Sequence, residues 1–169
     1  MTAVTHKSET DSHMSSTIVC VVSEAHSIPA PPVAVWSEIT PLERLASWND
    51  LFLSAEGVLR RGARLDLKLV VPDRDPLHLR PRVIEVAPPA RLCLGCETAD
   101  GISFRADYQL SIEERGSGSQ VAQVYRCSGH MPEDDLKAIA ARFRGVLMRF
   151  GEELVRHFGG AHSRDAGTI

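Results

Sequence analysis

The chain has 169 residues, enough for one domain with a real core, and a formal net charge of -3. With a pI near 6.2 and no basic run longer than Arg60-Arg61, this composition argues against a nucleic-acid-binding protein. No stretch approaches the ~18 apolar residues that a membrane span requires, and the N-terminus lacks the apolar region of a signal peptide. The sequence therefore predicts a cytoplasmic protein with no nucleic-acid partner and no membrane span.

The chain is expected to begin with a polar tail, followed by one strand and two short helices. Residues 1–16 offer almost nothing to bury and predict a disordered N-terminal tail. Residues 17–28 are rich in Ile and Val at their start, which is typical of a strand. On either side of Pro41 apolar residues recur at helical spacing, so two short helices are expected, at residues 32–39 and 42–48.

Residues 51–129 carry the signals of an antiparallel meander. Short apolar alternations are separated by turn residues at intervals of about 8 to 12. Six strands are expected, at residues 51–58, 63–71, 77–87, 91–98, 102–114 and 119–129.

The turns of this meander suggest how neighbouring strands pair. If residues 99–101 form a three-residue hairpin loop, Leu92 faces Tyr108. A four-residue loop at 115–118 then pairs Tyr108 with Tyr125. The side chains that share this face are mostly apolar and those on the other face are mostly polar. This pattern predicts a sheet with one wet face and one face for a helix.

The longest expected element is an amphipathic helix over residues 132–158. Its apolar residues fall within one arc when the chain turns by about 100° per residue. Acidic residues follow Pro132 at its start, where they suit the positive end of the helix dipole. Gly151 sits at the edge of the apolar arc, where another backbone or a ligand can approach closely, whereas Gly145 points outward. Residues 159–169 begin with two glycines and are predicted to be a C-terminal tail.

The expected elements follow the order strand, two short helices, six strands and long helix. Five characteristic sequence segments occur along this order. They are Ile28-Pro-Ala-Pro-Pro-Val-Ala-Val-Trp36, Leu45-Ala-Ser-Trp48-Asn49, Gly57-Val-Leu-Arg-Arg-Gly62, Arg82-Val-Ile-Glu-Val-Ala-Pro-Pro-Ala-Arg-Leu92 and Ser128-Gly129. In these features the chain resembles the START-related superfamily, known as SRPBCC, and within it bacterial polyketide cyclase/dehydrase-like proteins. The resemblance covers about residues 17–158. It implies an α+β helix-grip fold, in which a curved seven-stranded antiparallel sheet wraps the C-terminal helix around a cavity for lipids, sterols, polyketides or other apolar molecules.

An apolar pocket with a few polar groups is the usual form of a small-molecule site, and a chain with 5% aromatic residues has few large side chains to fill it. The residues expected to line the cavity and bind a ligand are Leu67, Leu69, Arg82, Leu94, Tyr108, Leu110, Gln123, Tyr125, Phe143, Leu147 and Phe150. Its polar members either contact the ligand or satisfy a buried neighbour. Arg82 and His78 face inward only if the 87–91 loop has five residues. The register there is ambiguous by one residue, and the direction of Arg80 is equally open.

No catalytic residue can be assigned from the sequence. His26 is a lone histidine near the end of the first strand, without the nucleophile, base and orienting group of a hydrolase. Cys93-Leu-Gly-Cys96 and Cys127-Ser-Gly-His130 have the spacing of a zinc site. However, residues three apart on one strand point to opposite faces, and the strand at 102–114 separates the two motifs. We therefore expect no metal, no cofactor and four reduced cysteines.

Three functions are compatible with the sequence. The favoured one is the binding of a hydrophobic small molecule, which Tyr108, Tyr125 and Arg82 would orient by hydrogen bonds. The alternative is a polyketide cyclase or aromatase, in which a tyrosine or Arg82 polarises a carbonyl and His26 or an unidentified group moves a proton. It ranks second because the pocket lacks an obvious pair of titratable residues. A protein-interaction module of the same fold would need an exposed apolar patch, which the alternation does not show.

Overall fold

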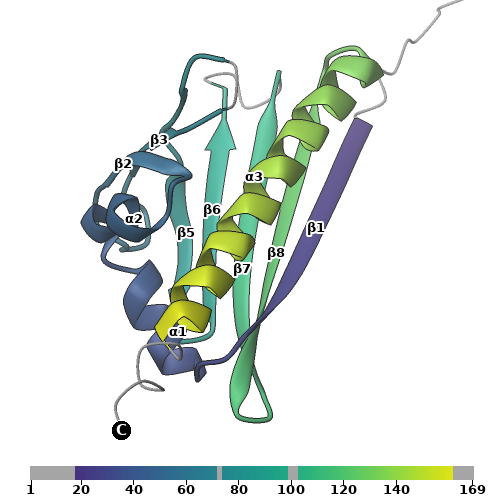
Figure 1. The fold of residues 1–169 in the computed structure, drawn as a ribbon. Helices are drawn as coiled ribbons and strands as arrows, with labels where there is room; N and C mark the ends of the chain where they lie inside the picture. Colours follow the sequence, from purple (N-terminus) through teal and green to yellow (C-terminus); the bar gives the residue numbers. More distant parts are fainter. Residues whose placement is uncertain (1–17, 72–73, 99–102, 162–169) are drawn as a thin grey trace, which may run out of the picture.

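The structure is a computed structural model of the chain and describes residues 18–71, 74–98 and 103–161. Figure 1 shows one long helix lying across a sheet, with two short helices and a smaller group of strands beside it. The tail predicted at residues 1–16 lies outside the described residues, as does most of the one predicted at 159–169. In chain order the elements are β1 (Ile18–Ile28), α1 (Pro32–Ile39), α2 (Leu42–Trp48), β2 (Phe52–Glu56), β3 (Asp66–Leu69), β4 (Leu77–Leu79), β5 (Arg82–Ala87), β6 (Arg91–Glu97), β7 (Arg105–Arg115), β8 (Gly118–Gly129) and α3 (Glu133–Ala161).

The strands form two antiparallel sheets that meet along one edge. The larger sheet has the order β1-β8-β7-β6-β5, and the smaller one has the order β2-β3-β4. Backbone hydrogen bonds join the segment before β3 to the start of β5. The Gly62 N–H donates to the Val83 carbonyl at 2.8 Å, and the Leu65 N–H donates to the Pro81 carbonyl at 2.9 Å. The two sheets therefore continue into each other as one layer, and with α3 they make the predicted α+β architecture.

The number of strands differs from the prediction. The strand expected at residues 77–87 is two strands, β4 and β5, which belong to different sheets. Pro81 lies between them. Because proline has no backbone N–H and a fixed φ, it cannot continue a ladder through the middle of a sheet. The described residues therefore contain eight strands rather than the predicted seven.

The register of β7 and β8 agrees with the prediction, whereas that of β6 and β7 is shifted by two residues. Tyr108 pairs with Tyr125, as expected. Leu92 pairs with Leu110 rather than with Tyr108. The connection between β6 and β7 is therefore longer than the loop expected at 99–101, which lies outside the described residues. Since side chains alternate with a period of two, this shift leaves each one on its predicted face.

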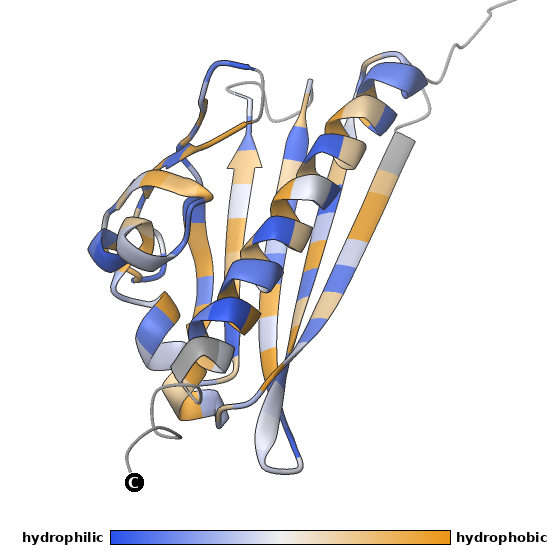
Figure 2. Ribbon diagram, viewed as in Figure 1, coloured by the Kyte–Doolittle hydropathy of each residue, from blue (hydrophilic) through white to orange (hydrophobic). Residues whose placement is uncertain are grey.

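Helix α3 packs its apolar face against the sheet, and Figure 2 shows hydrophilic residues along much of its opposite face. At Gly151 the helix packs closely on β1, and an added Cβ would overlap the His26 ring. The sequence predicted a close approach of a backbone or a ligand at this glycine, but it is a side chain that approaches. Gly145 is exposed, and a Cβ added there would have no neighbour within 4 Å. The buried apolar residues of α3 are Leu136, Ala140, Leu147, Phe150 and Leu154.

Buried residues form two clusters. The larger one includes the helices α1 and α2, whose apolar residues pack with β5, β7 and β8. The smaller one lies under the N-terminal half of α3 and includes Tyr125, Leu136 and Leu147. Residues from both clusters also line the cavity described next.

Candidate functional site

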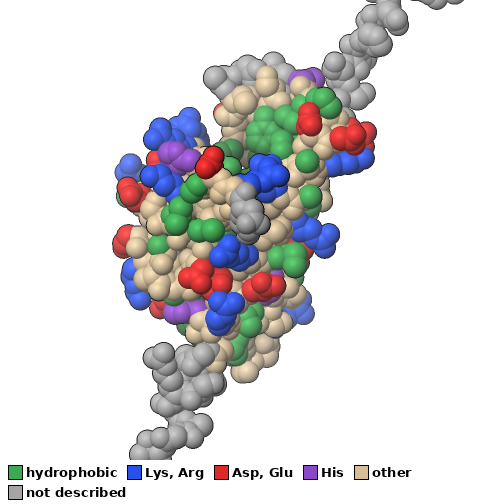
Figure 3. Space-filling view, turned by 45° about the horizontal axis from the view of Figure 1, so that its top comes forward, with side chains coloured by type: hydrophobic (Ala, Val, Ile, Leu, Met, Phe, Trp, Pro, Cys, Tyr) green, Lys and Arg blue, Asp and Glu red, His purple; other side chains and the backbone are tan. Residues whose placement is uncertain are grey.

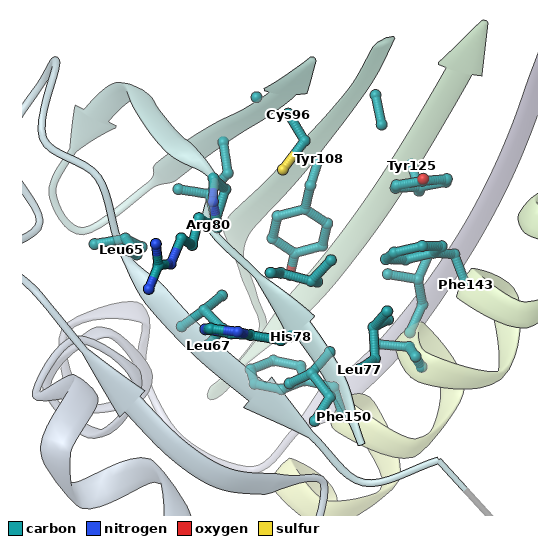
Figure 4. A pocket seen from close by; sticks show the side chains of 18 of the residues that line it. Leu65, Leu67, Leu77, His78, Arg80, Cys96, Tyr108, Tyr125, Phe143 and Phe150 are labelled. Carbon is teal, nitrogen blue, oxygen red and sulfur yellow. The ribbon is translucent and has the colours of Figure 1, made fainter. Parts of the chain in front are cut away.

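An internal cavity of about 480 Å³ lies between α3 and the two sheets. Its walls come from α2, from strands of both sheets and from the middle of α3, and half of the lining residues are Leu or Phe. Figure 4 shows Leu67 and Leu77 of the small sheet, Tyr108 of β7 and Phe150 of α3 grouped around this space. The volume lies within the range of roughly 300 to 1,000 Å³ that is usual for small-molecule sites.

The structure brings together nine of the eleven residues that the sequence predicted for the cavity wall. They are Leu67, Leu69, Leu94, Tyr108, Gln123, Tyr125, Phe143, Leu147 and Phe150. Leu110 points to the same side of the sheet but is buried in the larger core cluster and does not line the cavity.

The inward orientation considered for Arg82 is wrong. Ala87 pairs with Arg91, a register that by itself would put Arg82 on the same face as Leu92, but a β-bulge between Val83 and Glu85 shifts the pairing by one residue. Val83 is fully buried, and by alternation its neighbour Arg82 is exposed on the outer face of the sheet. Arg82 therefore takes no part in the cavity.

His78 and Arg80 border the cavity, but their side chains are engaged elsewhere. Asp66 accepts a hydrogen bond from Arg80 Nε at 3.1 Å, and its other oxygen lies 2.7 Å from His78 Nε2. The hydrogen bond with His78 is the main cause that lowers the pKa of Asp66. These three residues alternate with the buried leucines of β3 and the half-buried leucines of β4, so they lie on the outer face of the small sheet. They offer no acid or base to the interior.

Two polar residues of the cavity wall form hydrogen bonds with each other and with the backbone of α3. The Tyr108 hydroxyl donates to Gln123 Oε1 at 3.1 Å, and Gln123 Nε2 donates to the Leu147 carbonyl of α3 at 2.9 Å. Gln123 is 1% exposed, and burial raises the pKa of Tyr108 well above its usual range. This chain of bonds ties β7, β8 and α3 together, which is the structural role that the sequence left open for these residues.

Tyr125 is different because its hydroxyl has no hydrogen-bond partner among the described residues. The residue is 4% exposed, and its ring stacks on Phe143 of α3 with centroids 4.1 Å apart and an angle of 7° between planes. Burial is the main cause that raises the pKa of Tyr125, followed by the nearby Cys127 and Cys96 thiols. An unpaired buried hydroxyl costs roughly 1–3 kcal/mol, so this position is unusual in an otherwise apolar wall.

Sequence reasoning missed the parts of the wall supplied by β4 and by Cys96. Leu77 and Leu79 line the cavity from β4, and Cys96 lines it from β6. Cys96 was within reach of the sequence, because it follows Leu94 by two residues and so shares its face. The two leucines also alternate, but no sequence signal says that the small sheet folds over this side of α3.

The cysteine motifs do not converge. Cys93 Sγ lies 3.8 Å from Glu85 Oε2 at the outer face, whereas Cys96 points to the cavity, and β7 lies between β6 and β8. Burial raises the pKa of Cys93, Cys96 and Cys127. In the parts of the chain that the structure describes, no group of three or more His, Cys, Asp or Glu residues is placed to hold a metal ion.

Three solved structures place this arrangement among known folds. A START superfamily protein from Mycobacterium smegmatis is 16% identical with a TM-score of 0.64, covering 83% of this chain and 98% of that one. The chain has the START-related helix-grip fold. Norcoclaurine synthase from Thalictrum flavum shares this START-related fold at 15% identity and a TM-score of 0.63, covering 84% of this chain and 94% of that one. So does a protein of unknown function from Staphylococcus aureus, at 9% identity, a TM-score of 0.64 and coverage of 88% and 98%.

At these identities the likeness is one of fold, and it confirms the START-related helix-grip fold that the sequence motifs predicted. No protein-family model matches the chain, and no curated protein matches it in sequence. Among the helices that the structure describes, none is long and apolar enough to cross a membrane.

Proposed function

We propose that this protein binds a hydrophobic small molecule, lipid-like or polyketide-like, in the cavity between the sheets and α3. The observation that carries the proposal is the cavity of about 480 Å³ with walls of Leu and Phe side chains. Side chains around an empty space lose dispersion contacts, and a cavity in a core is destabilising. An apolar guest would restore those contacts and bury its own apolar surface, at about 25 cal/mol per Å².

Filling the cavity from its wall tests this proposal. Ala106 of β7 lines the cavity, so Ala106→Phe should occupy part of the space. Ala122 of β8 lies on the other face of the sheet, because its neighbours Val121 and Gln123 are buried inside, and Ala122→Phe is the matched control. The probe is the neutral fluorophore N-phenyl-1-naphthylamine, whose emission rises in apolar surroundings.

We expect the unmodified protein and Ala122→Phe to bind the probe with the same affinity, and Ala106→Phe to bind it at least about tenfold more weakly, a change of about 1.4 kcal/mol. The unfolding temperature of both variants checks that they are folded. No binding to the unmodified protein, or equal binding to all three proteins, would contradict the proposal.

An enzymatic role has weaker support from the same residues. Norcoclaurine synthase is named as a synthase, so this fold accommodates an enzyme in that protein. Here the tyrosines and Cys96 of the cavity wall have raised pKa values, and the Asp66–His78 pair faces outward. Candidate polyketides that bind in a 1:1 ratio and are recovered unchanged would favour binding, whereas turnover would favour a cyclase.

An interaction module is also less well supported. The exposed large apolar side chains of the described residues are spread over five elements and one loop, with two of them on α3, and they are Val21, Val33, Leu53, Val58, Ile84, Met148 and Val155. Figure 3 shows charged side chains of both signs spread over one face of the molecule, with small hydrophobic patches between them. Scattered apolar residues of this kind are normal on a protein surface.

A further inference from the structure

The buried polar side chains of the described residues include four atoms without a hydrogen-bond partner, and one of them belongs to the cavity wall. They are His26 Nδ1, Trp48 Nε1, Asn49 Nδ2 and the Tyr125 hydroxyl, and only Tyr125 lines the cavity. Tyr108 and Gln123, the neighbouring polar residues of the wall, already satisfy each other. The Tyr125 hydroxyl is thus the donor that the protein leaves free beside the cavity.

The positions of the charged residues around the cavity restrict the charge of the ligand, or guest, that it can hold. His78, Arg80, Glu97 and Arg142 belong to its wall, and all four are exposed residues at its rim. The buried part of the wall has no ionised side chain to balance a charged group. Since an unpaired buried charge is far more costly than an unpaired dipole, the part of the guest that lies inside should be uncharged.

The stack on Phe143 holds the Tyr125 ring in one orientation. Because the ring lies flat against Phe143, its hydroxyl is fixed relative to β8 and α3 before any guest arrives. The hydroxyl oxygen is enclosed, so an acceptor reaches it with a small displacement of apolar neighbours, for which the adjoining cavity gives room.

We propose that Tyr125 gives the cavity its specificity, by donating a hydrogen bond to the oxygen of an uncharged apolar guest such as a ketone, ester or ether. This inference rests on the proposed function and narrows its ligand class. The guest fills the space among the Leu and Phe side chains, and its acceptor pairs with the one buried hydroxyl that the described residues leave unpaired.

Two probes that differ by one oxygen test the inference. Fluorene is a hydrocarbon, and 9-fluorenone is the same ring system with a ketone. Their dissociation constants are measured by displacement of N-phenyl-1-naphthylamine from the unmodified protein, from Tyr125→Phe and from Ser111→Ala. Each substitution removes one hydroxyl, but Ser111 lies on the outer face of β7, because its neighbours Leu110 and Ile112 are buried inside.

We expect Tyr125→Phe to weaken the preference for the ketone over the hydrocarbon by about 3- to 10-fold, the effect of a single neutral hydrogen bond. Ser111→Ala should leave this ratio within about twofold of the unmodified protein, because its side chain lies on the face of the sheet away from the cavity. The carbonyl stretching band of bound 9-fluorenone should lie at lower frequency in the unmodified protein than in Tyr125→Phe.

The outcomes separate this inference from the function on which it rests. If neither probe binds the unmodified protein, both fail. If both probes bind and the ratio is the same in Tyr125→Phe, the inference is overturned while the proposed function stands. A ratio that changes as much in Ser111→Ala would also overturn the assignment to Tyr125.

Discussion

At the scale of single residues, two tyrosines that face each other across neighbouring strands have different surroundings. Tyr108 pairs with Tyr125 in the ladder, yet only the Tyr108 hydroxyl finds a partner, in Gln123. Both lie on the inner face, as the alternation predicted. Which of them would be left unpaired could not be predicted, because that depends on the length of the Gln123 side chain and on the Leu147 carbonyl of a helix far along the chain.

The titration of these two phenols is the first prediction. Burial raises both pKa values above the usual value of about 10. The folded pKa is thus the higher one, so the stabilisation is fully present below about pH 10 and is lost as the pH rises through the folded pKa values. Because the chain has two tyrosines, tyrosinate absorbance reports on them alone. It should appear at higher pH in the native protein than in urea.

Tyr125→Phe provides the check on this titration. It should remove about half of the absorbance change and make the unfolding free energy fall less steeply above about pH 10. Titration of either phenol in the native protein at the same pH as in urea would show that its hydroxyl is open to water.

At the scale of elements, the contact between α3 and β1 depends on one missing side chain. Gly151→Ala should destabilise the protein by about 1–3 kcal/mol, because the new methyl group overlaps the His26 ring. Gly145→Ala is the matched control on the same helix and should stabilise it by up to about 1 kcal/mol, since alanine favours helix and nothing lies nearby. Denaturant unfolding measures both changes.

A second substitution distinguishes steric overlap from other effects. In a His26→Ala background the cost of Gly151→Ala should largely disappear, because the ring that it meets is gone. If Gly151→Ala is as harmless as Gly145→Ala in the unmodified protein, α3 does not approach β1 as closely as the structure has it.

The elements themselves were predictable wherever one periodicity extends over many residues. The amphipathic pattern placed α3, and the alternation placed each face of β7 and β8. The prediction was wrong where a single residue decides. Pro81 divides a strand that reads as continuous, and the β-bulge between Val83 and Glu85 turns Arg82 outward.

At the scale of the whole molecule, the cavity is a property of how the elements pack and not of any one of them. Leu110 shows the limit of sequence reasoning, because its face was correct but its position along β7 puts it in the core. The alternation gives the side of a sheet that a residue faces. It does not say where the space between that side and α3 is filled.

The thiols of β6 report on occupancy of this space, since Cys96 lines the cavity and Cys93 lies on the outer face of the same strand. Burial raises both pKa values, so both thiols need mildly alkaline solution to react with N-ethylmaleimide. With N-phenyl-1-naphthylamine at about ten times its dissociation constant, Cys96 should react about tenfold more slowly, because only the unoccupied fraction is open. Cys93 should react at an unchanged rate.

Both cysteines fall in the tryptic peptide 92–105, so fragment masses separate the two sites. Equal protection of the two thiols, or protection of neither, would place the probe outside the cavity.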